Sequence, residues 1–230
     1  MLGIIGAMEE EIWEIKESID GISSVDIGNF TFYQGKLKNK EIVLVECGIG
    51  KVNASICTTL MVSQFNVEKI LFTGVAGGVA PDINIGDVVI GTYLMEHDYD
   101  VTAFGYEVGI IPKMGDSKFH CDTDLIRLAY DLAKENLKET NILKGPIVSG
   151  DVFVASEEKI NWLWDKFQAY CTEMEGAAVA HVCTVLKVPF LIVRSISDKA
   201  NSDAKLDFKE FCKVAAKNSK LLIEKLIEKI

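Results

Sequence analysis

Three acidic residues, Glu11, Glu175 and Asp198, stand where a carboxylate could take part in chemistry. Asp198 ends an apolar run, beside Ser197, and Glu11 lies in the first turn of a helix expected to follow the run at 2–6. An acid in a partly desolvated cleft has a raised pKa and can donate a proton at neutral pH. The same residues could instead close turns or complement helix N-termini. Residue types alone leave both interpretations open.

The stretch TEMEGAAVAHV at 172–182 places Glu173, Met174 and Glu175 directly before a run of small residues. Small residues let a helix pack close to a sheet, which leaves a carboxylate little route to water. A carboxylate there is favoured if it accepts hydrogen bonds from the hydroxyls of a ligand. The alternative is a solvated helix N-terminus. For Glu173 we expect either a helix cap or a role in positioning a water molecule.

The order of apolar runs and helical patterns predicts an α/β fold. Strands are expected at 2–6, 41–48, 69–78, 87–94, 145–150 and 189–198. Helices are expected at 9–20, 51–65, 123–138, 156–168, 175–187 and 207–229. Such alternation indicates a largely parallel sheet between helices, and 29–47 reads as a hairpin that would make the sheet mixed. We therefore expect one domain over residues 1–230, a three-layer αβα sandwich with a central mixed sheet.

Glycine-rich segments follow two of the expected strands, GIGK at 48–51 and GVAGG at 74–78. In open α/β sheets ligands bind beyond the carboxyl ends of the strands. Neither segment matches a dinucleotide fingerprint or a P-loop. We expect a backbone cradle for a small planar ligand, although turns that need glycine would read the same way.

Composition excludes several classes of protein. The 230 residues carry a formal net charge of −10, which argues against nucleic-acid binding. Six cysteines without a CxxC pair indicate reduced thiols and a cytoplasmic protein. No segment has the roughly 20 apolar residues of a membrane span. The three histidines lack metal-ligand spacing, so we expect no metal.

Seven segments together resemble the 5'-methylthioadenosine/S-adenosylhomocysteine nucleosidases of the nucleoside phosphorylase superfamily. They are GIIGAMEEE at 3–11, GIGKVNA at 48–54, TGVAGG at 73–78, DVTAFGYEVG at 100–109, VSGDVF at 148–153, EMEGAAVAHVC at 173–183 and VPFLIVRSISDKA at 188–200. The resemblance implies a homodimer that hydrolyses the N-ribosidic bond of 5'-thio-substituted adenosines to adenine and a 5-thioribose. It implies no cofactor.

The resemblance also implies roles for individual residues. Glu11 matches a base that activates water, Asp198 an acid that protonates N7 of adenine, and Glu175 an acceptor for the ribose hydroxyls. The other substrate-binding positions would be Ile49, Ala76, Gly77, Phe153, Val154, Glu173, Met174, Arg194, Ser197 and Phe208. A loop carrying Val101, Phe104, Tyr106 and Pro112 would cover the pocket of the partner subunit.

One position departs from the family pattern, because Val75 stands where a serine or threonine is common. The loss of that hydroxyl puts a phosphate-binding role in doubt. The charge of Glu11 also disfavours phosphate as nucleophile, and we expect Arg194 to orient Glu11 or Glu175 instead. Two alternatives remain, hydrolysis of 6-amino-6-deoxyfutalosine, which has the same adenosine half, and a nucleoside-binding protein without turnover.

Overall fold

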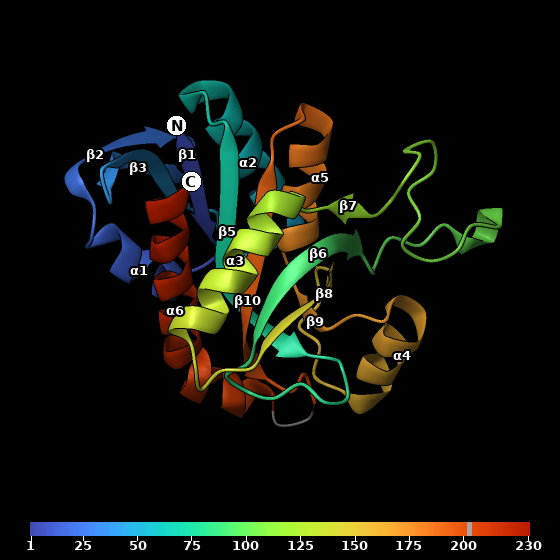
Figure 1. Cartoon of the computed structure of the whole chain (residues 1–230). Coiled ribbons are helices and arrows are strands. Elements are labelled where there is room, and N and C mark those ends of the chain that lie inside the picture. The colour runs from blue at the N-terminus through green and yellow to red at the C-terminus, as the bar shows by residue number, and fades with distance from the viewer. Residues whose placement is uncertain (202–203) are drawn as a thin grey trace.

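The computed structural model describes residues 1–201 and 204–230, with only some of the side chains of the last helix. Half of the sheet is open (Figure 1). Its strands run in the order β2 (Asp20–Ile27), β3 (Phe30–Leu37), β4 (Lys40–Glu46), β1 (Leu2–Gly6) and β5 (Lys69–Gly78). β4, β1 and β5 are parallel, and β2 and β3 form antiparallel pairs at the edge. The mixed sheet expected from the sequence is confirmed.

The other half of the sheet closes into a ring. From β5 it passes through β10 (Phe190–Asp198), β6 (Val88–Glu96), β8 (Ile142–Ser149) and β9 (Cys171–Glu173) back to β5. The residues of β9 pair with Gly77 and Gly78, at the carboxyl end of β5. The ring therefore brings the ends of β5, β8 and β10 together at one edge.

Helices cover both faces of the sheet, as the sequence predicted (Figure 1). One face carries α1 (Glu9–Lys16), α3 (Thr123–Asn136) and α6 (Ala204–Lys229), and the other carries α2 (Lys51–Phe65) and α5 (Gly176–Leu186). α4 (Glu157–Phe167) packs through Leu163 and Phe167 on a smaller apolar cluster. None of the described helices is long and apolar enough to cross a membrane. The main core is the apolar body of the parallel strands, fully buried at residues such as Ile4, Leu44, Leu71 and Ile192.

Three details differ from the sequence expectation. α1 ends at Lys16 rather than at residue 20, because the chain turns there into β2. β2 is an exposed edge strand with the sequence DGISSVDI, so no apolar run marks it. β7 (Phe119–His120) and β9 have only two and three residues, which is too short for a periodic pattern. The predicted hairpin is correct, and Lys38 and Asn39 take positive φ at its turn.

Candidate active site

A cavity of about 240 Å³ opens at the carboxyl ends of β1, β5 and β10. It contains most of the predicted site, namely Glu11, Ile49, Ala76, Gly77, Phe153, Val154, Glu173, Met174, Glu175, Ser197, Asp198 and Phe208. Residues as far apart in the chain as Glu11 and Phe208, 197 positions, thus meet at one place. The lining is mostly apolar. Its carboxyl groups come from the ends of the strands β9 and β10 and from the starts of the helices α1 and α5.

Glu11 projects from the first turn of α1 and is buried. Its Oε2 accepts hydrogen bonds from the amides of Ala7 (2.7 Å) and Met8 (3.1 Å), and its Oε1 accepts one from Val75 (2.9 Å). Burial raises the pKa of Glu11, while the charge of Arg194 and the three amides oppose that rise. The carboxylate is therefore held rigidly in a poorly solvated place, which suits a general base.

The carboxylate of Glu11 needs space that only glycine leaves. A Cβ atom at Gly74 would lie 2.5 Å from Oε1 of Glu11, closer than any real Cβ contact. The glycines of 74–78 were predicted to let the backbone approach a ligand. At Gly74 the group that needs the space is the side chain of Glu11.

Asp198 ends β10 and is also buried. The hydroxyl of Ser197 lies 2.9 Å from Oδ2, and the amide of Ala200 donates to Oδ1 at 2.8 Å. Ala200 takes a φ of 53°, so the chain bends sharply to bring its amide back. These contacts fix the direction in which the carboxyl group faces the cavity.

Glu175 stands immediately before α5, and its Oε1 accepts a hydrogen bond from the amide of Gly50 at 2.7 Å. Burial, and after it the neighbouring charge of Glu173, raises the pKa of Glu175 to about 8. The carboxyl group lines the cavity, where it can accept hydrogen bonds from a bound molecule. The prediction that this acid is buried rather than solvated is correct.

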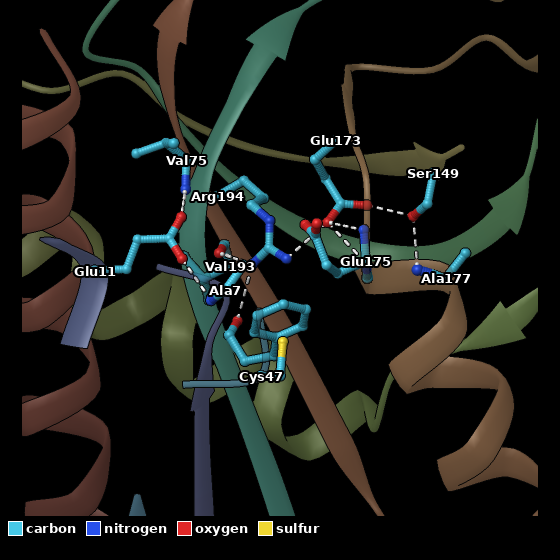
Figure 2. Close-up of polar contacts among 12 residues, drawn as sticks. Ala7, Glu11, Cys47, Val75, Ser149, Glu173, Glu175, Ala177, Val193 and Arg194 are labelled. Carbon is cyan, nitrogen blue, oxygen red and sulfur yellow. Dashed lines mark hydrogen bonds and ion pairs between the residues drawn. The ribbon is translucent and has the colours of Figure 1, made fainter. Parts of the chain in front are cut away.

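Both carboxylate oxygens of Glu173 accept hydrogen bonds from other groups of the protein (Figure 2). Its Oε2 accepts hydrogen bonds from the amide of Gly176 (2.7 Å) and from the guanidinium of Arg194 (2.8 Å), and its Oε1 accepts one from the hydroxyl of Ser149. The Ser149 oxygen in turn accepts from the amide of Ala177 at 2.7 Å. The bonds to the amides of Gly176 and Glu175 fit the first role considered for Glu173, a helix cap. Its role in positioning a water molecule stays a prediction.

Arg194 is buried beneath the cavity and, in the described structure, does not line it. Its guanidinium stacks on Phe72 with 4.0 Å between Cζ and the ring centre. Figure 2 shows the side chain between Glu11 on one side and the Glu173–Glu175 pair on the other. Arg194 was expected to orient Glu11 or Glu175; its hydrogen-bonded carboxylate is Glu173, and it reaches the other two through charge.

Aromatic and aliphatic side chains form the mouth of the cavity. The rings of Phe153 and Phe208 meet edge to face, with centres 6.2 Å apart. Phe153, Ile49 and Val152 are each about half exposed, at 48%, 56% and 52%. This open apolar wall suits a flat ring and a short apolar substituent.

The four predicted loop residues lie elsewhere within the single chain. Val101, Phe104, Tyr106 and Pro112 belong to the segment between β6 and β7, which projects from the body of the molecule (Figure 1). They do not line the cavity of the described chain, and Phe104 is 81% exposed. Their proposed reach into a partner's pocket stays a prediction.

Five lining residues were not predicted, namely Ala7, Met8, Val75, Val152 and Thr172. Each is next to a predicted site residue or, for Ala7 and Met8, supplies an amide to one. Their positions near or just beyond the ends of strands, rather than their residue types, could have indicated them. Thr172 adds a buried Oγ1 for which the described structure gives no hydrogen-bond partner.

The whole chain is similar to proteins of one family. Residues 1–228 match the model of the phosphorylase superfamily. A 5'-methylthioadenosine/S-adenosylhomocysteine nucleosidase from Staphylococcus carnosus is 43% identical over 231 residues, covering 100% of both chains. The chain belongs to this family of nucleosidases.

Solved structures agree with that membership. The Neisseria meningitidis nucleosidase in complex with methylthio-immucillin-A has 39% identity and a TM-score of 0.95, covering 100% of this chain and 99% of its own. A futalosine hydrolase from Helicobacter pylori has 37% identity and a TM-score of 0.94, covering 100% and 97%. The fold of the nucleosidase family is thus shared over the full length, and the αβα prediction is confirmed.

Proposed function

We propose that the protein hydrolyses the N-ribosidic bond of 5'-methylthioadenosine and S-adenosylhomocysteine, releasing adenine and the 5-thioribose product. The observation that carries the proposal is the meeting of Glu11, Glu175 and Asp198 in one cavity, within a chain that is similar to these nucleosidases throughout. No organic cofactor is required, because the reaction needs only proton transfers and water.

In the proposed reaction one carboxyl group accepts a proton and another donates one. Water bonds to C1' of the ribose as the C1'–N9 bond breaks, and the electrons of that bond go to adenine. Glu11 takes a proton from the water, and Asp198 gives one to N7 of the departing base. The carboxylate of Glu11 also favours the positive charge that develops on the sugar ring. The fixed contacts of both side chains support these roles.

The remaining lining residues would hold the two halves of the nucleoside. Glu175 accepts hydrogen bonds from the ribose hydroxyls, with Met174 packed against the sugar. Phe153 and Phe208 enclose adenine, with Val154 at its edge, and Ser197 orients Asp198. Ala76 and Gly77 form the floor, and Ile49 contacts the 5'-thio group. The apolar mouth formed by Ile49 and Val152 supports the last assignment.

Charge supports water rather than phosphate as the nucleophile. Among the described residues, the cavity lining includes three glutamates and an aspartate but no lysine or arginine. The nearest guanidinium, that of Arg194, is already paired with Glu173 at 2.8 Å. A phosphate would meet the negative charge of Glu11, with no lysine or arginine in the described lining to bind it. Val75, in place of a hydroxyl residue, provides no side-chain donor for an anion.

We further propose that the protein acts as a cytoplasmic homodimer. Exposed apolar side chains lie on two helices that pack together, Val52 and Ile56 on α2 and Val185 and Leu186 on α5, and exposed apolar side chains favour a protein interface. A partner's loop with Val101, Phe104, Tyr106 and Pro112 would complete the 5' end of the pocket. Cys47, Cys57, Cys121, Cys171 and Cys183 are buried free thiols, which suits a reducing compartment; Cys212 lies outside the described side chains.

A second candidate is hydrolysis of 6-amino-6-deoxyfutalosine, favoured by the similarity to the Helicobacter pylori futalosine hydrolase. The apolar mouth favours a methylthio group over a polar 5' extension. Specificity constants for the two substrates, measured side by side, decide between them. Tight adenosine binding by calorimetry with no adenine produced would instead indicate a binding protein without turnover.

The test of the proposed function is release of adenine from 5'-methylthioadenosine in phosphate-free buffer. We expect turnover by the wild type without added phosphate. Turnover that depends strictly on phosphate would contradict the proposal.

A further inference from the structure

Two consecutive amides at the N-terminus of α2 donate to carboxylates from two different segments. The amide of Gly50 donates to Oε1 of Glu175 at 2.7 Å, and the amide of Lys51 donates to Oδ1 of Asp151 at 2.8 Å. Gly50 takes a φ of 97°, and a Cβ there would lie 3.1 Å from Oδ1 of Asp151. Helix N-termini attract negative charge, and here that attraction joins the Gly48–Lys51 turn to both acids.

Asp151 belongs to a closed ring of hydrogen bonds, which we call the 51–98–151 ring. The Asp151 side chain accepts from the Lys51 amide, and the Lys51 ammonium donates to Oδ1 of Asp98 at 2.6 Å. Oδ2 of Asp98 accepts from the Asp151 amide at 2.9 Å. The Lys51 ammonium also contacts Glu96 at 2.9 Å, so its one positive charge faces two carboxylates, that of Glu96 at the end of β6 and that of Asp98 just beyond it.

The 51–98–151 ring lies between two parts of the cavity wall. On one side are Ile49 and the Gly50 amide that holds Glu175. On the other side, directly after Asp151, are Val152, Phe153 and Val154. None of the three ring residues lines the cavity in the described structure. The ring therefore can act on a bound molecule only through the position of the two walls.

We propose that Asp151 is a positioning residue that fixes the distance between the Gly48–Lys51 turn and the Val152–Val154 segment. Through the Lys51 amide it sets the direction of the neighbouring Gly50 amide, and so the place of the Glu175 carboxylate. Through Asp98 it sets the start of the segment that carries Phe153. This role rests on the proposed function, in which those two side chains hold the ribose and the adenine.

The test compares three variants in the intact protein. Asp151→Ala removes the acceptor for the Lys51 amide, whereas Asp151→Asn keeps a side-chain oxygen in the same place. Asp122→Ala is the matched control, because Asp122 also accepts amides at a helix N-terminus, those of Asp124 and Leu125 in the first turn of α3. The control lies far along the strand from the cavity, since the amide of Asp122 donates to the carbonyl oxygen of Phe190, at the opposite end of β10 from Asp198.

The first readout is kinetic. We expect Asp151→Ala to raise KM for 5'-methylthioadenosine about fivefold, the value of one lost hydrogen bond, with a smaller change in kcat. Asp151→Asn should restore most of that loss, and Asp122→Ala should lower Tm without changing KM. A folded Asp151→Ala variant whose KM matches that of the wild type would overturn the proposal, since the ring would then serve stability alone.

The second readout does not depend on turnover. Amide hydrogen exchange at Gly50 and Lys51 should quicken in Asp151→Ala and not in Asp151→Asn. If the wild type released no adenine, the proposed function would fail, while the exchange rates would still decide the role of Asp151. Equal exchange at Gly50 in all variants would overturn it.

Discussion

Four carboxyl groups of one cavity differ in what their oxygens contact. Glu11 accepts three amides and Glu175 one. Glu173 is bound to Arg194 and the start of α5, and Asp198 is held by Ser197 and Ala200. All four are glutamate or aspartate, and their different surroundings support the four different roles proposed for them: a base (Glu11), a hydroxyl acceptor (Glu175), a helix cap (Glu173) and an acid (Asp198). The resemblance to a known family implied these roles, whereas the residue types alone left them open, because contacts such as Glu11 with Val75 and Glu175 with Gly50 join distant segments.

Asp198→Asn tests the proposed acid. The asparagine keeps an oxygen for the Ala200 amide, so the fold should persist, but it has no proton to give to adenine. We expect kcat to fall by about 10²–10⁴, the usual contribution of one proton-transfer partner, with Tm near that of the wild type. Single-turnover adenine release checks the first expectation and thermal unfolding the second. A variant with wild-type kcat would show that the acid lies elsewhere.

Glu175 makes the free energy of unfolding depend on pH. Its pKa is about 8 in the folded protein and near 4.5 in the unfolded chain. Between these values the folded state binds the extra proton, so the free energy of unfolding falls as the pH rises from about 5 to 8. In Glu175→Gln this contribution is absent. Urea unfolding of both proteins across that range should show the wild type losing stability relative to the variant. If the free energies of unfolding of the two proteins changed with pH in the same way, the raised pKa of Glu175 would be contradicted.

At the scale of elements, the sequence indicated each α-helix and each long buried strand, because buried parallel strands are continuous apolar runs. It did not indicate β2, β7 or β9, where strands are exposed or very short. β9 matters most, since its pairing with the end of β5 closes the ring and carries Thr172 and Glu173 to the cavity. Such pairing is decided by long-range contacts that no local pattern records.

The fit between β5 and α1 can be tested at Gly74. In Gly74→Ala the new methyl group would meet the carboxylate of Glu11, so this proposed base must move. We expect kcat to fall about 10²-fold, as for a misplacement near 1 Å, with circular dichroism unchanged.

Gly78→Ala, on the same strand, is the control, because its methyl group would meet a side-chain methyl of Ile83 instead. It should lower kcat far less. Equal losses in the two variants would show that the effect comes from β5 in general and not from Glu11.

At the scale of the molecule, the exposed apolar side chains of α2, Val52 and Ile56, lie close in the chain to Ile49 and Gly50, which belong to the site. Val52 is 68% exposed. We expect Val52→Glu to give a monomer by light scattering and to reduce turnover, because an interface that supplies the partner's loop would be lost. Val25→Glu, at an exposed apolar position of the edge strand β2, should leave the mass unchanged. Wild type that is monomeric at micromolar concentration would contradict the proposed dimer.

The most direct test of the account is the chemical identity of the sugar product. The protein is incubated with 5'-methylthioadenosine and saturating phosphate, and the products are resolved by mass spectrometry. A cavity lined by four carboxyl groups, with its nearest arginine already paired, predicts free 5-methylthioribose with adenine, at a rate that phosphate does not change. Formation of 5-methylthioribose 1-phosphate would contradict it.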